Sequence, residues 1–371
     1  MLKVGAPVDL TQIREKVYAG ERLSFEDGLK LFESNNVTEL CQMANHVRER
    51  LHGDKAYFSH KYRLYPTNIC MYRCRFCAFR VSKGDERGYE WPAEKTLHEL
   101  SRVDLTGVTE FHIVGGVHPD WGFEMYLDIV RELHREYPDI HIKAWTAVEV
   151  DAFARLSGKS VRQVLEELRE AGLGSLPGGG AEIFDWEIRR TICRTKCTGE
   201  RWIEVHETAH DLGMNTNSTM LYGHLETPES KVDHMLRLRD LQDRTGGFRT
   251  FIPLAFHPDN TRLKHLPRST GAEDLKHIAI GRLLLDNIPH IMAYWVTETP
   301  EVAQVGLSFG ADDLDGTIMV DEEIINAAGG KHVEGAMTKD RFAAMIREAG
   351  RVPLERDTEF NVIREYQEMS L

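Results

Sequence analysis

Residues 62–80 carry the strongest indication of fold and chemistry in this 371-residue chain, and they read YRLYPTNICMYRCRFCAFR. The stretch opens with a short apolar run that predicts a β-strand. It continues into Cys70, Cys74 and Cys77, spaced Cys-x3-Cys-x2-Cys, with no fourth cysteine close downstream. Thiolates at such short separations can converge on one metal centre. Iron–sulfur clusters are usually held by four Cys thiolates, so three ligands on a four-iron cluster leave one iron open.

An open coordination position distinguishes a catalytic metal site from a closed structural one. The alternative interpretations of the three cysteines are a zinc knuckle and chance clustering. Zinc requires a fourth Cys or His in register, and none stands close downstream. The pattern therefore favours an incompletely ligated iron–sulfur cluster.

Beyond these residues, short apolar runs alternate with amphipathic segments. Strands that alternate with helices predict a parallel sheet, and eight repeats of this unit predict a closed (β/α)8 barrel of the TIM type, an α/β fold. The predicted strands are Tyr62–Thr67, Glu110–Val114, His141–Thr146, Leu173–Leu176, Asn215–Leu221, Arg249–Pro253, His290–Trp295 and Asp312–Leu314. The predicted helices are Glu94–Leu105, Glu124–Glu136, Val161–Ala171, Arg201–Leu212, Glu229–Arg244, Asp274–Asp286 and Pro300–Ser308.

The two ends of the chain differ from this rhythm. Residues 9–50 have the helical periodicity and capping residues of helices with charged faces. Residues after about 335 also look helical, beginning at Thr338. We therefore predict an N-terminal helical extension over residues 1–55 that covers one end of the barrel, the barrel itself over 56–335, and a C-terminal helical cap over 336–371.

Composition narrows the function classes. The net charge of −13 argues against a general nucleic-acid-binding surface. No apolar run approaches the length of a transmembrane helix, and the N-terminus lacks the hydrophobic region of a signal peptide. Six cysteines, three of them clustered, indicate metal binding in a reducing cytoplasm rather than a disulfide framework. We expect a cytoplasmic protein that uses neither nucleic acid nor membrane as a partner.

Polar or glycine-rich motifs follow nearly every predicted strand. They include Gly115-Gly116, Gly178-Gly179-Gly180-Ala181-Glu182, the run from Tyr222 through His224 to Glu226, and His257. The active site of such a barrel is built from loops at the carboxyl ends of its strands. This placement predicts one active site at that end of the barrel.

The cysteine motif, with the aromatic Phe76 directly before the last cysteine, resembles the signature of the radical S-adenosylmethionine (SAM) superfamily. The resemblance implies a [4Fe-4S] cluster held by Cys70, Cys74 and Cys77, with SAM chelating the open iron. An electron from the cluster then splits SAM into methionine and a 5′-deoxyadenosyl radical. In many members a Gly-Gly-Glu loop receives the SAM amino group, whereas here Val117 stands in place of the glutamate.

Candidate site residues follow from the motifs and the resemblance together. Those expected to contact the cofactors are Phe76, Gly115, Gly116, His118, Gly179, Gly180, Glu182 and Glu226. Those expected to act on the substrate are Arg80, Tyr222 and His224, because a guanidinium, a phenol and an imidazole can orient carboxylates or move protons. The alternatives are a tight turn at Gly115-Gly116, solvated side chains at Glu182 and Arg80, and structural histidines. Cys41, Cys193 and Cys197 read as ordinary cysteines.

Longer strings narrow the resemblance to aminofutalosine synthases of the futalosine route to menaquinone. They are YPTNIC (65–70), FCAF (76–79), SLPGGGAE (175–182), YGHLET (222–227), FIPLAFHP (251–258) and GADDLDG (310–316). The resemblance implies a transferase that adds the adenosyl radical to 3-[(1-carboxyvinyl)oxy]benzoate and consumes SAM. Rearrangement and loss of the carboxyl group as carbon dioxide or bicarbonate then give 6-amino-6-deoxyfutalosine.

It also implies a substrate with carboxylates and a reductant protein such as a flavodoxin or ferredoxin. Alternatives are the cyclic dehypoxanthine futalosine cyclase of the same route, the tyrosine-coupling subunit of F0 synthase, and a non-catalytic metal-binding scaffold.

Overall fold

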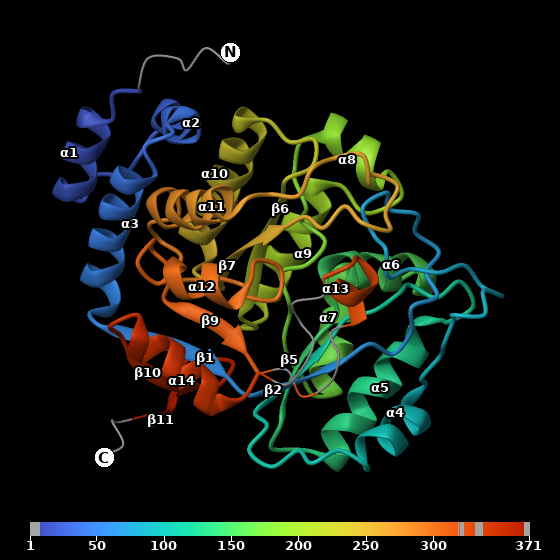
Figure 1. The fold of residues 1–371 in the computed structure, drawn as a ribbon. Coiled ribbons are helices and arrows are strands. Elements are labelled where there is room, and N and C mark those ends of the chain that lie inside the picture. The colour runs from blue at the N-terminus through green and yellow to red at the C-terminus, as the bar shows by residue number, and fades with distance from the viewer. Residues whose placement is uncertain (1–7, 318, 320–322, 331–336, 367–371) are drawn as a thin grey trace.

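A ring of parallel strands forms the centre of the computed structural model, which describes residues 8–317, 319, 323–330 and 337–366 (Figure 1). One arc contains β2 (Lys61–Leu64), β3 (Glu110–Ile113), β4 (His141–Ala144) and β5 (Leu173–Ser175). A second arc contains β6 (Thr216–Tyr222), β7 (Phe248–Ala255) and β8 (His290–Ile291). Single parallel bridges from Leu176 to Thr216 and from Met292 to Asp313 connect the arcs and lead to β9 (Asp313–Gly316). The ring closes because β9 pairs with β1 (Lys55–Ser59), which continues after His60 into β2.

The predicted (β/α)8 barrel is thus confirmed, and amphipathic helices surround it. The surrounding helices are α4 (Ala93–Leu100), α5 (Phe123–Glu136), α6 (Ala147–Ser157), α7 (Val161–Glu170), α8 (Trp186–Cys193), α9 (Gly199–Asp211), α10 (Pro228–Thr245), α11 (Gly271–Leu284) and α12 (Pro300–Gly306). On α5, Tyr126, Ile129, Val130 and Leu133 are buried at the three- and four-residue spacing of a helix that packs one face on a core. Helices α6 and α8 were not predicted from the sequence.

The N-terminal helices lie on the side of the barrel rather than over its end, which corrects the predicted placement. They are α1 (Thr11–Ala19), α2 (Phe25–Glu33) and α3 (Val37–His52). Helix α3 packs on α11 and α2 packs on α10, as the blue helices of Figure 1 show. The reason is the apolar face of α3, where Leu40, Met43, Ala44 and Val47 are buried.

The C-terminal segment also differs from the predicted helical cap. Helix α14 (Lys339–Glu348) begins after Thr338 as predicted, and α13 (Glu323–Ala327) precedes it. The chain then forms β10 (Val352–Arg356), parallel to β1, and β11 (Val362–Glu365), antiparallel to β10. The edge of β1 offers unpaired backbone groups, and pairing with β10 satisfies them.

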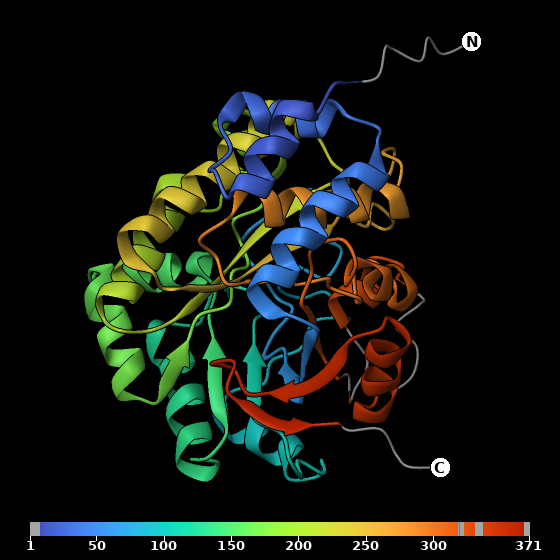
Figure 2. The same ribbon diagram turned by 90° about the vertical axis from the view of Figure 1, so that its left-hand side faces the viewer.

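These last strands close the amino-terminal end of the barrel. The Arg356 guanidinium pairs with the Asp313 carboxylate, and the Thr358 hydroxyl donates to Glu110 Oε2 over 2.7 Å. The Phe360 ring stacks on His290 with centroids 3.5 Å apart. In Figure 2 the red strands lie low in the molecule, on the side opposite the blue N-terminal helices. The barrel therefore has a closed floor at its amino-terminal end.

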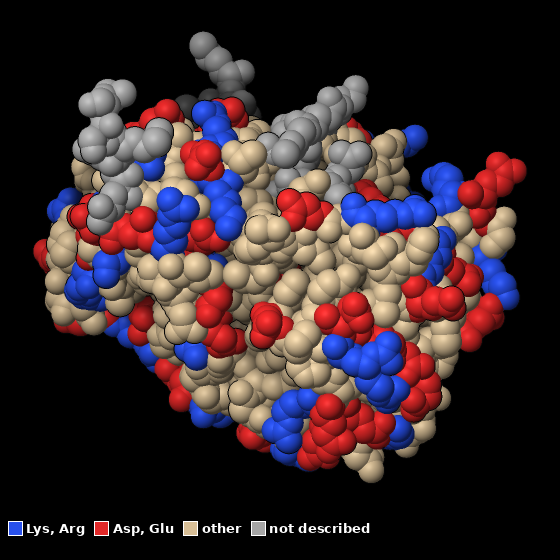
Figure 3. Space-filling model, turned by 90° about the horizontal axis from the view of Figure 1, so that it is seen from below, with Lys and Arg blue, Asp and Glu red and all other residues tan. Residues whose placement is uncertain are grey.

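Two surface findings bear on partners. Over the described ranges, every helix is too short or too polar to traverse a lipid bilayer. On the face shown in Figure 3, acidic and basic side chains are interspersed and form no continuous basic stripe.

Candidate active site

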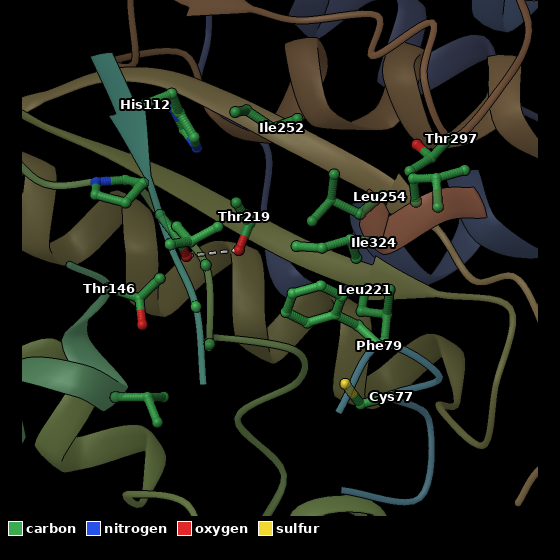
Figure 4. Close-up of a pocket in the computed structure, with 18 of the residues that line it drawn as sticks. Cys77, Phe79, His112, Thr146, Thr219, Leu221, Ile252, Leu254, Thr297 and Ile324 are labelled. Carbon is green, nitrogen blue, oxygen red and sulfur yellow. Dashed lines mark hydrogen bonds between the residues drawn. The ribbon is translucent and has the colours of Figure 1, made fainter. Parts of the chain in front are cut away.

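A cavity of about 360 Å³ runs from the loops at the carboxyl ends of the strands into the barrel. In the view of Figure 4, Cys77 lies low and both His112 and Ile252 lie high, with Leu254 and Leu221 at heights between them. Strand residues that face the cavity alternate with residues that face the helices, as Asn217, Thr219 and Leu221 do on β6.

All three motif cysteines line this cavity. They lie in the loop after β2, which is fixed by a backbone bond from Cys70 N to Val81 O at 3.1 Å and by another from Arg75 N to Ile192 O at 2.7 Å. Burial raises the pKa of the Cys74 thiol to about 12 in the absence of a metal. A metal must therefore displace the proton, which binding to a thiolate ligand does.

The loop after β3 lies directly against the cysteine loop. Val117 N–H donates to Cys70 Sγ over 3.3 Å, and Gly116 N–H donates to Thr67 O over 2.7 Å. A Cβ at Gly116 would approach Ile69 O to 2.3 Å, so only glycine fits there. This contact explains the glycine pair by close approach to the cysteine loop.

A buried carboxyl group, not predicted as a site residue, forms hydrogen bonds to the backbone of that loop. Glu149 accepts from Gly115 N–H over 3.0 Å and from Thr146 N–H over 2.7 Å, and it lines the cavity. Burial raises the pKa of Glu149 to about 7, although these hydrogen bonds oppose the shift. The cavity thus contains a carboxyl group near Gly115, while residue 117 is a valine.

The glycine-rich loop after β5 forms another wall. Gly179, Gly180 and Glu182 line the cavity as predicted, and Glu182 accepts from Lys196 Nζ over 2.6 Å. Lys196 also lies 5.0 Å from the centre of the Phe76 ring. Although burial opposes it, the Glu182 carboxylate holds the pKa of Lys196 well above its usual value. A fixed positive charge therefore lies beside the cysteines.

Two residues that the sequence did not single out hold this wall in place. The buried Arg189 side chain donates to Ile183 O over 3.1 Å and to Cys197 O over 2.6 Å. Trp202 Nε1 donates to Gly179 O over 3.1 Å. Hydrogen bonds from these side chains to backbone carbonyls depend on the loop conformation, so they could not be predicted from the sequence.

Four predicted site residues lie outside the cavity. Tyr222 is fully buried against the helix layer, where its hydroxyl donates to Asp274 Oδ1 over 2.8 Å. His224 bonds Leu221 O at 3.0 Å, and Glu226 accepts from His224 N–H over 2.8 Å, so both shape the turn after β6. His118 is buried with its Nε2 atom 2.8 Å from Glu90 Oε1.

The remaining predicted residues do line the cavity. Arg80 is half-buried at its edge, with Nη2 2.6 Å from Ser82 Oγ. Phe76, Gly115, Gly116 and the three cysteines line the same cavity. The structure therefore brings together ten of the fourteen predicted side chains and glycines, and separates His118, Tyr222, His224 and Glu226 from them.

The deep end of the cavity is charged, although no charged cluster is predicted there from the sequence. Its lining includes Lys61 and Arg63 from β2, Lys143 from β4 and Asp315 from β9. This charged end could have been predicted from one sequence pattern, the occurrence of charged residues at alternate positions of otherwise buried strands.

Comparison with known proteins identifies the family to which this chain belongs. Residues 64–238 match the model of the radical SAM superfamily, and residues 245–369 match that of the CofH/MqnC C-terminal region. The chain is 48% identical to the aminodeoxyfutalosine synthase of Thermus thermophilus over 359 residues, 96% of each protein. The chain belongs to the radical SAM superfamily.

Other relatives agree with this assignment. The aminodeoxyfutalosine synthase of Streptomyces coelicolor is 40% identical over 96% of this chain and 94% of its own length. The cyclic dehypoxanthine futalosine synthase of Halalkalibacterium halodurans is 37% identical over 96% of this chain and 95% of its own. The crystal structure of methylornithine synthase superposes with a TM-score of 0.72 at 17% identity, covering 92% of this chain and 97% of that one, which supports the fold.

Members of the radical SAM superfamily use SAM and a [4Fe-4S] cluster, and the residues present fit such a cluster. Three thiols face one cavity, and no other cysteine of the described chain lines it. One of these sulfurs already accepts a backbone N–H, the kind of bond that tunes cluster potential. A four-iron cluster held by these three thiolates would have one iron without a protein ligand.

Proposed function

We propose that this chain is an aminodeoxyfutalosine synthase, which joins the adenosyl group of SAM to 3-[(1-carboxyvinyl)oxy]benzoate and yields 6-amino-6-deoxyfutalosine. Methionine leaves from SAM, and the enol carboxyl group of the substrate leaves as carbon dioxide or bicarbonate. The observation that carries the proposal is 48% identity along nearly the whole chain to the aminodeoxyfutalosine synthase of Thermus thermophilus, together with three thiols in one barrel cavity. When bound, the cluster and SAM supply a 5′-deoxyadenosyl radical.

The residues of the cysteine loop and the two glycine loops would hold these groups. Cys70, Cys74 and Cys77 are the proposed cluster ligands. SAM carries an ammonium and a carboxylate group, and the Glu182–Lys196 pair offers one partner for each. The proposed SAM contacts also include Phe76, Gly115, Gly116, Gly179 and Gly180.

The chain's own contribution to the reaction is position and the exclusion of water. The apolar side chains of Leu221, Leu254 and Phe79 surround the space in front of the cysteines. A water-poor enclosure protects a reactive carbon centre and keeps the vinyl group next to it. Arg80 at the cavity edge is available to a carboxylate there.

The residues outside the cavity receive a different role. We propose that His224 and Glu226 act as positioning residues, because their bonds fix the turn after Leu221, which faces the cavity. Tyr222 and His118 support neighbouring elements in the same indirect way.

The wider setting is also a proposal. We propose that residues 56–335 form the reacting domain between a segment over 1–55 and another over 336–371, the latter contributing Arg356 to the floor. We propose a flavodoxin or ferredoxin as electron donor. All six cysteines are free thiols, which suits the cytoplasm.

The test is product analysis on anaerobically prepared, cluster-loaded protein with a strong reductant and SAM. Incubation with 3-[(1-carboxyvinyl)oxy]benzoate is expected to give an adenosine-containing adduct by mass spectrometry. In parallel, a futalosine-derived substrate tests cyclase activity, and tyrosine with 5-amino-6-(D-ribitylamino)uracil tests the tyrosine-coupling activity of the F0 synthase alternative. Turnover only in one of these parallel reactions would replace the proposal.

A further inference from the structure

We infer that the outer surface of the cysteine loop is the docking site for a small acidic protein that delivers single electrons. The inference rests on the proposed function and adds to it the surface that receives the reductant. Three observations carry it: a group of arginines that keep their charge in an acidic chain, an exposed tryptophan beside them, and their closeness to the motif cysteines.

Three segments that are distant in sequence meet at the cysteine loop. Arg73 N–H donates to Thr195 Oγ1 over 3.5 Å, just after α8 ends. Arg75 N–H donates to Ile192 O on α8 over 2.7 Å, and Arg75 O accepts from Arg262 N–H over 2.9 Å. The cysteine loop, the end of α8 and the segment after β7 therefore lie side by side.

Four arginines lie on these segments, and we call them the arginine patch: Arg73, Arg75, Arg194 and Arg262. Three of them are exposed, and Arg75 is half-buried. Within the described chain, none of the four guanidinium groups forms a salt bridge. Exposed arginines elsewhere often do, as Arg131 does with Asp128 on α5. The patch thus keeps its positive charge in a chain whose net charge is −13.

A patch of this kind selects an acidic partner. Opposite charges steer a protein toward its docking surface and raise the rate of association. Complexes that transfer electrons bury little surface and are transient, so charge contributes much to the choice of partner. On α8 the acidic Glu187 is paired with Arg190, so its charge is already balanced and does not offset the patch.

An exposed tryptophan gives this surface an apolar contact point. Trp186 begins α8 and is 52% exposed, although tryptophan side chains are largely buried on average. Arg190 and Arg194 follow it at four-residue spacing, so the three side chains share one side of the helix, while Ile192 is buried on the other. Tryptophan and arginine are enriched among the residues that contribute most to protein interfaces.

The path from this surface to the cavity is short. Arg73 is exposed to solvent, whereas the next residue, Cys74, is buried and lines the cavity. Electron transfer slows steeply with distance, so a carrier docked here is well placed to reduce a group held by the thiols. One electron leaves the reduced carrier and enters the bound cluster, so the carrier is oxidised and the cluster is reduced by one electron.

The experiment measures docking first. Unreduced, cluster-loaded protein is titrated calorimetrically with an acidic flavodoxin and with an acidic ferredoxin. Wild-type protein is expected to bind one of these carriers, and raising the salt from about 0.05 M to about 0.5 M should weaken the complex about tenfold, because salt screens exposed charges. Arg194→Glu combined with Arg262→Glu should weaken it at least about tenfold at the lower salt concentration.

The matched control is Arg50→Glu combined with Arg341→Glu. It changes the net charge equally at two exposed arginines on α3 and α14, which lie on the left of Figure 1, away from α8. Carrier binding by this variant should stay within about twofold of wild type, because salt screens charges at that distance.

Electron delivery is measured next. SAM cleavage with dithionite should be unchanged in the patch variant, whereas cleavage with limiting reduced carrier should fall about tenfold. An unchanged dithionite rate also shows that the variant is folded. If that rate is lost, Arg194→Gln combined with Arg262→Gln replaces the variant, with an expected weakening of carrier binding of about threefold.

Each outcome decides the question. The inference is overturned by undiminished carrier binding in the patch variant, by equal weakening in the control, or by wild type that binds neither carrier. It is also overturned if a short RNA or DNA duplex binds the patch more tightly than either carrier does. An adduct formed with dithionite alongside any of these results refutes this inference alone, whereas the absence of an adduct with dithionite removes the proposed function.

Discussion

The mouth and the floor of this barrel are built in different ways. At the mouth, three thiols and the backbone of two glycine loops face the cavity, and Cys70 Sγ accepts the N–H of Val117. At the floor, charged side chains from the strands already pair with one another, and the C-terminal strands close the barrel beneath them. The mouth is thus built to receive groups from outside, whereas the floor is largely complete without a ligand.

This difference predicts how each region responds to change. Removing a mouth residue is expected to abolish a bound group and the chemistry while leaving the fold in place. Removing a floor residue is expected to destabilise the fold, because it leaves buried charges without partners.

The largest effect is expected at the mouth. Cys70→Ala, Cys74→Ala or Cys77→Ala should each abolish turnover and the paramagnetic signal of the reduced [4Fe-4S] cluster, because a two-thiolate site lacks a ligand that the cluster requires. Cys41→Ala is the matched control, since Cys41 contacts Ser308 O away from the cavity. An intact, active cluster in any of the three variants would contradict the assignment of the mouth.

The next largest effect is expected at the floor. Asp315→Asn leaves Lys61 and Arg63 without the carboxylate that they share, which should lower the free energy of unfolding by about 3–5 kcal/mol. Urea denaturation measures it, with Asp128→Asn as the control because Asp128 pairs with Arg131 on the surface. A loss no larger than that of the control would mean that the floor network contributes little to the fold.

The two regions also differ in how far the sequence predicts them. The cysteine spacing and the glycine strings are local patterns, so Cys70, Gly116 and Glu182 could be assigned to one site from sequence alone. The partners of the floor come from distant segments: Arg356 and Asp313 meet only because β10 pairs with β1, some 300 residues earlier in the chain. Local periodicity contains no information about such a pairing.

The error at β6 has a simpler cause. Tyr222 follows Leu221, and adjacent residues of a strand face opposite sides of the sheet. Because Thr219 and Leu221 face the cavity, Tyr222 must face the helices. The alternation of side chains along β6 therefore excludes Tyr222 from the cavity. The prediction was made because the loop that Tyr222 begins follows the carboxyl end of a strand. Glu149, which lies just past the third predicted strand, was given no role in the site for another reason: it lies inside α6, and its role depends on the approach of Gly115.

A moderate effect that depends on pH is expected from Glu149 at the mouth. Its pKa of about 7 in the folded protein exceeds the value of an exposed glutamate, so the folded state keeps a proton that the unfolded chain releases. Stability should therefore fall as pH rises from about 4.5 to 7, by up to about 3 kcal/mol, and Glu149→Gln should lack this part of the fall. Thermal unfolding of wild type and variant between pH 4.5 and 8 measures the difference. Parallel curves would show that the carboxyl is already ionised near pH 6.

The smallest effect is expected at Tyr222, beside the cavity but outside it. Tyr222→Phe removes the hydroxyl that donates to Asp274 and should cost about 1 kcal/mol of stability, because one buried hydrogen bond is lost. SAM cleavage and adduct formation should stay within about twofold of wild type, because a stability loss of this size leaves nearly all of the protein folded. Steady-state assays at one temperature measure the effect on turnover, and urea denaturation midpoints measure the effect on stability. A large loss of turnover with an unchanged midpoint would bring the phenol back into the reaction and extend the mouth across β6 to α11.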